Sequence, residues 1–213
     1  MGVAGVRAAP YRIEAEQCVI RCYEPADAPA LVEAVTRSLD HLLPWMPWAA
    51  HEPQTVDQRV AFIRACRADF DADVNYTYGI FDRDESRVLG GTGLHPRGGP
   101  GSLEIGYWVR SDSLRQGIAT EVSAVLTRVA FEICGVERVD IQIDPENERS
   151  TGVPLKLGFV HEATLRRRLD SKKEGGPRRD SLLFTMVREE LPASACMRFA
   201  YVAFDAAGVL IGP

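Results

Sequence analysis

Residues 101–135 join a strand-like run to a long amphipathic stretch through a short polar turn, and this segment restricts the fold most strongly. Residues 101–109 (GSLEIGYWV) have the apolar and aromatic content of a strand. Residues 116–134 (QGIATEVSAVLTRVAFEIC) have the apolar spacing of a helix, and Gly135 follows as a residue type that often ends helices. The segment therefore predicts a helix that starts directly after a strand, which is a building unit of α/β folds.

Gly117 stands where this helix is expected to begin, in the stretch SLRQGIATE of residues 113–121. The first four N–H groups of a helix have no partner within the helix, and the helix dipole adds partial positive charge there. An anion is the natural ligand of such a place, and a glycine lets it approach without a Cβ atom in the way. A tight turn that binds nothing is the alternative. Neither GxxxxGKS/T nor GxGxxG with a following acidic strand end occurs, which excludes a P-loop and a dinucleotide site.

The rest of the chain alternates strand-like and helical stretches. Helices are expected at residues 27–42, with Asp27 as the cap, at 55–73, with Thr55 as the cap, and at 145–158, where we expect a break near Pro154. Further strands are expected at residues 17–23, 75–82, 87–95, 136–144, 159–169 and 179–191. The order βααβββαβαβ, with one more strand, predicts a mixed α/β sheet with helices on both faces.

Composition and charge narrow the classes of function. The chain has 213 residues, enough for one domain or for one domain with a tail. Its 25 basic and 30 acidic residues leave a net charge of −5, which does not favour general DNA binding. No apolar run approaches the roughly 20 residues of a membrane span. The five cysteines are irregularly spaced and form no CxxC pair, so we expect reduced thiols, a cytoplasmic protein and no metal site.

Five short motifs follow one another in the second half of the chain. They are EIGYW at residues 104–108, GIATE at 117–121, DPEN at 144–147, then Ser150, and KLGF at 156–159. In this order and spacing they resemble the GNAT superfamily of acyl-CoA-dependent N-acyltransferases, in the branch of the ribosomal-protein N-terminal acetyltransferases. The resemblance covers roughly residues 15 to 190. It implies a mixed, mostly antiparallel central sheet whose splayed central strands hold an acyl-CoA.

The resemblance also implies a set of coenzyme-binding residues. The amides of the loop at the helix start would hold the coenzyme A diphosphate, and this loop consists of Arg115, Gln116, Gly117, Ile118, Ala119 and Thr120. Trp108 and Val109 would pair with the pantetheine amides like an added strand, and Asn147 would hydrogen-bond the same arm. Ser150, one helical turn later, would reach toward the thioester sulfur.

Two positions depart from the pattern of the superfamily. Leu114 stands where the loop often begins with Arg or Gln, and Pro154 stands where a general-acid tyrosine is common. Main-chain donors carry most of the diphosphate binding, so the first departure matters little. The second leaves Ser150 as the nearest substitute for the acid.

The chemistry of amide formation adds a requirement for a base, because an amine attacks a thioester only when it is neutral. Glu104, on the central strand, is the predicted base, with pairing to an arginine as its structural alternative. His95, at the end of the preceding strand, is the second candidate, with an exposed turn position as its alternative. The leaving thiol has a pKa of about 8.5, so the Ser150 hydroxyl suffices to assist it.

The acceptor side and the chain end are less well specified by the sequence. In the loop of residues 43–50, Trp45 and Trp48 either line an acceptor pocket or pack the connection between two helices. The basic residues between 166 and 179 form either a solvated loop or a basic lip. Residues 11–190 are expected to form the acyltransferase domain. Residues 191–213 would then be an apolar tail, forming a hairpin on a sheet edge or a homodimer contact.

Together these observations predict an N-acyltransferase that uses acetyl-CoA and acetylates a primary amine by direct attack. The acceptor is either a protein N-terminus or a small amine. A non-catalytic acyl-CoA-binding sensor is one alternative, and a transferase of another acyl group, such as succinyl, is a second.

Overall fold

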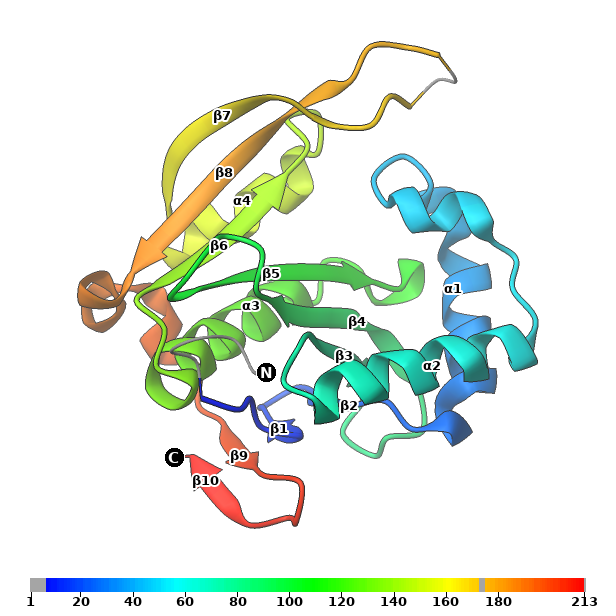
Figure 1. Ribbon diagram of the computed structural model, residues 1–213, viewed down its shortest axis with the longest axis horizontal. Coiled ribbons are helices and arrows are strands. Elements are labelled where there is room, and N and C mark those ends of the chain that lie inside the picture. The colour runs from blue at the N-terminus through cyan, green and yellow to red at the C-terminus, as the bar shows by residue number, and fades with distance from the viewer. Residues whose placement is uncertain (1–6, 173–174, 213) are drawn as a thin grey trace.

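The computed structural model describes residues 7–172 and 175–212, whose strands form a single sheet (Figure 1). The strand order is β10-β9-β1-β2-β3-β4-β5-β6-β8-β7, and every neighbouring pair is antiparallel except β5 and β6. The strands are β1 (Arg12–Glu14), β2 (Val19–Cys22), β3 (Tyr76–Phe81), β4 (Val88–His95), β5 (Ser102–Val109), β6 (Arg138–Ile143), β7 (Val160–Leu169), β8 (Arg179–Val187), β9 (Val202–Phe204) and β10 (Leu210–Gly212). The predicted mixed, mostly antiparallel sheet is confirmed.

Helices cover both faces of this sheet, as predicted (Figure 1). On one face α1 (Ala28–Leu42) contacts β4, and α2 (Val56–Asp71) contacts β3. On the other face α3 (Ile118–Val129) contacts β5, and α4 (Glu148–Leu157) contacts β6. Helix α2 begins at Thr55, whose hydroxyl accepts a hydrogen bond from the Gln58 amide while the Gln58 side chain accepts one from the Thr55 amide.

Short helical turns connect several of these elements. The 3-10 turns are Pro25–Asp27, Pro47–His51, Ser111–Ser113, Arg188–Ala193 and Ala195–Arg198, and a π turn at Ala130–Cys134 extends α3 as far as Gly135. The last expected strand, 179–191, therefore ends at Val187, after which the chain turns.

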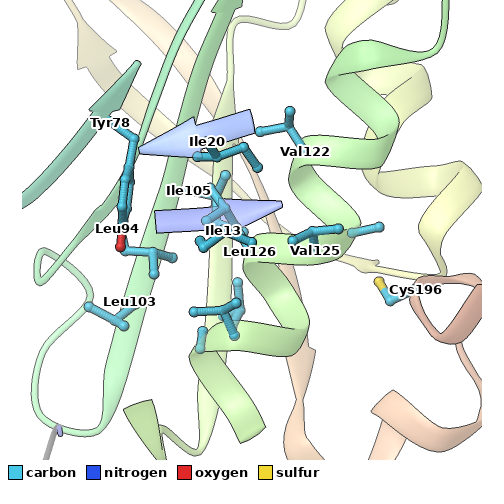
Figure 2. Packing of buried hydrophobic residues seen from close by; sticks show 14 of the residues in the cluster. Ile13, Ile20, Tyr78, Leu94, Leu103, Ile105, Val122, Val125, Leu126 and Cys196 are labelled. Carbon is cyan, nitrogen blue, oxygen red and sulfur yellow. The ribbon is translucent and has the colours of Figure 1, made fainter. Parts of the chain in front are cut away.

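The main hydrophobic core lies between the sheet and α3. Val122, Val125 and Leu126 of α3 are fully buried and point toward strand residues from both halves of the sheet (Figure 2). The strand side chains opposite them are Ile13, Ile20, Tyr78, Leu94, Leu103 and Ile105. A second cluster, with Val19, Leu31, Val35, Ile63 and Phe81, joins α1 and α2 to the other face. This packing fixes both helix layers to the same strands.

Strands β5 and β6 pair for only three residues and then diverge. Ser102–Glu104 of β5 pair with Arg138–Asp140 of β6, whereas β5 continues to Val109 and β6 continues to Ile143 without pairing to each other. The splayed central strands that the sequence predicted are therefore present. From residue 105 onward, the edge of β5 that faces β6 has main-chain groups available to a ligand.

Three local expectations need correction. Strand β1 precedes the first expected strand and was missed, because three residues are too few for a periodic pattern. Helix α4 is not broken near Pro154 but continues through it to Leu157. Helix α3 begins at Ile118 rather than at Gln116, because Gly117 occupies the cap in a left-handed conformation with φ of 87°.

The chain after residue 191 packs on the same core as the rest. Its β9–β10 hairpin pairs along β1 and so extends the sheet at one edge. Leu191, Cys196 and Tyr201 are buried in the main core. Leu210 and Ile211 on β10 are exposed. Whether the tail forms a unit of its own or a homodimer contact stays a prediction, which truncation and light scattering would test.

Candidate active site

Two cavities lie on either side of the end of β5. The first, about 560 Å³, lies among the end of β5, the start of α3 and the first turns of α4. The second, about 650 Å³, lies on the side of α1 and α2 and is also lined from β3 and β4. Met46, Tyr107 and Trp108 line both cavities. The two cavities are therefore adjacent at these three residues.

The start of α3 provides the main-chain part of the first cavity. Arg115 has a φ of 62° and Gly117 a φ of 87°, so the loop adopts the left-handed conformation twice within three residues. The first hydrogen bond within α3 runs from the Glu121 amide to the Gly117 carbonyl, at 3.0 Å. The amides of Ile118, Ala119 and Thr120 precede that bond and are free for an anion.

The structure adds a second reason for the glycine to the one expected. A Cβ atom on Gly117 would meet only the Gln17 side chain, at 3.5 Å, which is an ordinary contact. The positive φ, which side-chain-bearing residues rarely adopt, therefore favours glycine here even without a ligand, and the close approach of an anion stays a prediction.

Nearly all the residues predicted to bind the coenzyme line the first cavity. These are Trp108, Val109, Arg115, Gly117, Ile118, Ala119, Thr120, Asn147 and Ser150. Gln116 is exposed, and its side-chain amide lies 3.4 Å from the Asp112 carbonyl. The predicted motifs, which are far apart in the sequence, therefore converge on one cavity with a row of main-chain donors at one end. Such a cavity has the donors that a diphosphate needs.

Asn147 and Ser150 belong to the same helix cap. Asn147 is the N-cap of α4, and its Oδ1 accepts a hydrogen bond from the Ser150 amide at 3.2 Å. This bond fixes the amide group so that its Nδ2 remains a donor for a ligand carbonyl. It also fixes the backbone of Ser150 at the cavity wall.

The two tryptophans of the loop after α1 separate onto the two cavities. Trp45 lines the first cavity, and the Lys172 ammonium lies 4.1 Å from the centre of its ring. Trp48 lines the second cavity and packs against Trp108, with ring centres 5.9 Å apart. Only Trp48 therefore lies on the side expected for the acceptor.

His95 lines the second cavity together with Asn75. The His95 Nδ1 lies 2.6 Å from Asn75 Oδ1, which makes Nδ1 the protonated nitrogen and leaves Nε2 as an acceptor. Burial lowers the pKa of His95 to about 4. The imidazole is therefore neutral near pH 7, and Nε2 can accept a proton only weakly.

A buried ion pair lies at the other end of the second cavity. Arg59 is 4% exposed, and its Nη2 donates to the Glu52 carboxylate. Within residues 7–172 and 175–212, Arg59 Nε and Gln54 Oε1 have no hydrogen-bond partner. Both residues line the cavity. Because Glu52 balances the charge of Arg59, the remaining N–H groups suit a neutral carbonyl better than a second carboxylate.

Glu104, the predicted base, lines neither of these two cavities. Its Oε1 accepts a hydrogen bond from Arg97 at 3.3 Å, and its Oε2 accepts one from Gln142 at 2.8 Å. Burial raises the pKa of Glu104 despite the nearby Arg97 cation. Arg97 does line the second cavity, and His95 pairs with Glu104 across β4 and β5. Arg97 therefore lies between the Glu104 carboxylate and the second cavity.

Tyr107 is a residue at the junction of the two cavities that sequence reasoning missed. It follows Gly106 in the EIGYW motif, it lines both cavities, and its hydroxyl donates to the Ser150 carbonyl at 3.1 Å. The motif supplied Glu104 and Trp108 as candidates but not Tyr107, because a tyrosine on a buried strand is ordinarily part of a core.

Comparison with known proteins identifies the fold and its chemistry. The acetyltransferase (GNAT) domain family matches residues 17–160. The chain belongs to this GNAT family. The Bacillus subtilis (strain 168) protein "Putative ribosomal N-acetyltransferase YdaF" is 29% identical over 176 residues, which are 82% of this chain and 93% of that protein.

Solved GNAT structures share the architecture. Mycobacterium smegmatis RimJ in complex with CoA-disulfide aligns with a TM-score of 0.77 and 27% identity, covering 89% of this chain and 93% of RimJ. A GNAT acetyltransferase from Bacillus anthracis aligns with a TM-score of 0.70 over 84% of this chain and 99% of that one, at 21% identity, and supports the fold alone. The expectation of an N-acetyltransferase that depends on acetyl-CoA is confirmed.

Among residues 7–172 and 175–212, no group of three or more His, Cys, Asp or Glu side chains is placed to hold a metal ion. Within the same residues, no helix combines the length and the apolar character needed to cross a bilayer.

Proposed function

We propose that this GNAT enzyme acetylates the α-amine of a peptide or protein N-terminus by direct attack on acetyl-CoA. The observation that carries this proposal is the shared wall of the two cavities at Met46, Tyr107 and Trp108. An acyl donor in the first cavity and an amine in the second would meet there without a covalent enzyme intermediate. The name of YdaF, a putative ribosomal N-acetyltransferase, supports the choice of a protein acceptor.

The first cavity is proposed to bind the coenzyme mainly through its backbone. Acetyl-CoA supplies the acetyl group as an activated thioester. The amides of Ile118, Ala119 and Thr120, at the positive end of the α3 dipole, bind the diphosphate. The unpaired edge of β5 at Trp108 and Val109 binds the pantetheine amides, and Asn147 Nδ2 donates to a carbonyl of the same arm. Gln116, whose side chain is exposed, contributes at most its main-chain amide.

Ser150 is the proposed hydrogen-bond donor to the leaving sulfur. It lies in the first turn of α4, on the wall of the first cavity. A thiol with a pKa of about 8.5 leaves readily at neutral pH, so a hydroxyl that donates a hydrogen bond is sufficient. The absence of a tyrosine at Pro154 is then compatible with catalysis.

Glu104 and His95 are the proposed alternatives for accepting the proton of the amine. His95 Nε2 has access from the second cavity but a low pKa, whereas Glu104 has a raised pKa but reaches that cavity only through Arg97. An N-terminal amine has a pKa of about 8 and is partly neutral at pH 7, so it needs a weaker base than a lysine does. This match favours an N-terminus over a lysine side chain as the acceptor.

Arg59 and Gln54 line the second cavity, and each has a buried polar atom without a partner in the described part of the chain, which supports a peptide acceptor. A peptide group offers a carbonyl oxygen, which Arg59 could bind, and an N–H, which Gln54 Oε1 could accept, once a movement of these side chains brings their buried atoms to the cavity surface. A simple alkylamine offers neither group. We therefore expect Arg59 and Gln54 to recognise the first peptide group after the reacting amine.

The proposal is tested by measuring coenzyme A release from acetyl-CoA or succinyl-CoA, with simple alkylamines and with three matched peptide acceptors. The first is a tripeptide amide, X-Ala-Ala, with X varied. The second is its ester analogue, which keeps the first carbonyl but lacks the N–H. The third is an E-alkene analogue, which lacks both. We expect kcat/KM to decrease from the amide to the ester and from the ester to the alkene, by about three- to tenfold at each step. Mass spectrometry should place the acetyl group on the α-amine.

Turnover of alkylamines but of none of the peptides would contradict the peptide acceptor while leaving the acetyltransferase intact. Faster release with succinyl-CoA than with acetyl-CoA would contradict the choice of acyl group. Tight binding of acetyl-CoA without release on any acceptor would point to a sensor instead.

A reducing cellular location is also proposed. The five cysteines are all free, and Cys18, Cys22, Cys134 and Cys196 are buried. Free buried thiols are typical of proteins that act in the cytoplasm.

A further inference from the structure

A proline inside α4 leaves one helical carbonyl without its usual donor. Pro154 has no N–H, so the carbonyl four residues earlier, that of Ser150, cannot receive its regular α-helical hydrogen bond. The preceding turn is regular, because the Thr151 amide donates to the Asn147 carbonyl at 3.0 Å. The carbonyl that lacks its helical hydrogen bond therefore belongs to Ser150, the residue that is proposed to assist the leaving sulfur.

Tyr107 supplies the missing donor from another element. Its hydroxyl, on β5, donates to the Ser150 carbonyl, on α4, at 3.1 Å. Burial raises the pKa of Tyr107 to about 12, so the hydroxyl stays protonated and remains a donor at physiological pH. With Asn147 Oδ1 on the Ser150 amide, both main-chain groups of Ser150 are then held by side chains.

We propose that Tyr107 is a positioning residue, which holds Ser150 at the coenzyme cavity through the carbonyl that Pro154 leaves free. The three residues act as one unit: Pro154 removes the helical bond, Tyr107 replaces it, and Ser150 is placed by the replacement. This inference rests on the proposed role of Ser150. It assigns no proton transfer to Tyr107, whose hydroxyl is engaged with the carbonyl.

If Pro154, Tyr107 and Ser150 act together, the effect on kcat of removing the Tyr107 hydroxyl should depend on the residue at position 154. Pro154→Ala restores an N–H that can donate to the Ser150 carbonyl, and it also raises helix propensity, so this variant should fold and melt at a higher temperature. In the wild-type background, Tyr107→Phe should lower kcat about three- to tenfold, corresponding to the loss of one hydrogen bond. In the Pro154→Ala background the same change should lower kcat by less than about twofold.

Three further measurements separate positioning from general damage. The dissociation constant of coenzyme A should change less than about twofold in Tyr107→Phe, because the diphosphate amides are untouched. Tyr201→Phe is the matched control. It removes a tyrosine hydroxyl of the C-terminal tail that donates to the Glu132 carboxylate at 2.8 Å, and it should leave kcat unchanged. In a Ser150→Ala background, Tyr107→Phe should have no additional effect on kcat.

An equal loss of kcat in the wild-type and Pro154→Ala backgrounds would overturn the proposal, and so would a full additional loss in the Ser150→Ala background. Either result would mean that Tyr107 acts directly on the substrates. Wild-type turnover of Ser150→Ala itself would contradict the proposed role of Ser150, and this inference with it. The peptide acceptor would stand, because the acceptor series does not depend on Ser150.

Discussion

The two cavities of this protein are built in different ways. The coenzyme cavity has a backbone end, made by a left-handed glycine, the first amides of α3 and the unpaired edge of β5. The acceptor cavity is built from side chains of α1, α2, β3, β4 and the connecting loop, including Trp48, Arg59 and His95. A backbone site depends on where the chain turns, whereas a side-chain site depends on which residues distant segments bring together. Coenzyme binding at the backbone site should therefore tolerate substitutions that change only a side chain, but not substitutions that change the backbone conformation.

Gly117→Val gives the largest expected effect and tests the backbone origin of the coenzyme cavity. A β-branched residue is strained at a φ of 87°, so the loop should rearrange and its amides should no longer converge. We expect coenzyme A affinity, measured by calorimetry, to fall by more than about a hundredfold, equivalent to roughly 3 kcal/mol.

Gly208→Val is the matched control for Gly117→Val. Gly208 has a φ of 76°, lies in the turn between β9 and β10, and has no atom within 4 Å of a built Cβ. It should carry the same backbone strain and leave coenzyme affinity unchanged. Unchanged affinity in a folded Gly117→Val protein would break the contrast between the two cavities.

Ser150→Ala comes next in size and tests a side-chain contribution within the coenzyme cavity. The change should lower kcat about ten- to a hundredfold with little change in coenzyme affinity, because the hydroxyl is proposed to act only as the sulfur leaves. Single-turnover kinetics and calorimetry give the two quantities. Thr151→Val, which removes the neighbouring hydroxyl outside the cavity wall, should behave like the wild type. Normal turnover of Ser150→Ala would show that the thiolate leaves unaided.

Glu104→Gln tests, through the pH dependence of the rate, whether a side chain on the acceptor side takes the proton of the amine. A carboxylate acts as a base only when ionised, so the wild-type rate should rise with pH as Glu104 passes through its raised pKa. The variant should lose this rise and leave a flatter profile in initial-rate measurements. A profile identical to that of the wild type would assign the proton to His95 or to bulk water.

His95→Gln comes last because it is expected to change the pH dependence of stability rather than binding or rate. Burial lowers the pKa of His95 to about 4, below its ordinary 6.5, so the native state binds this proton less tightly than the unfolded state. The free energy of unfolding should therefore decrease as pH falls from about 6.5 to about 4 and be insensitive to this group above 6.5. Denaturant titrations should show roughly 3 kcal/mol less loss in the variant over that range. Equal losses would mean that His95 is solvated in the native state.

The contrast also explains what the sequence could predict. Gly117 left a visible signal because a left-handed cap favours one residue type, and the motifs around it converge on one cavity. The order of strands and helices was predictable from apolar spacing, except for the three residues of β1. Arg59 and Gln54 gave no signal, because each is an ordinary polar residue at the start of a helix and becomes informative only when β3 and β4 pack beside it.

The Tyr107 contact was hidden for a related reason. Pro154 predicted a broken helix, since a proline ordinarily disrupts the helix interior. The helix continues instead, and the carbonyl that Pro154 leaves free is bonded by a strand residue 43 positions from Ser150 in the sequence. Periodicity describes one element at a time, so it cannot show a hydrogen bond that one element supplies to another.

A bisubstrate conjugate tests the central claim, that donor and acceptor cavities meet at Tyr107 and Trp108, most directly. In this conjugate the sulfur of coenzyme A is joined through an acetyl linker to the α-amine of the tripeptide amide, and its inhibition constant is measured against both substrates. We predict competitive inhibition against acetyl-CoA and against the peptide, with an affinity at least about tenfold above that of coenzyme A. Competition with acetyl-CoA alone, at an affinity unchanged by removing the peptide portion, would contradict the account.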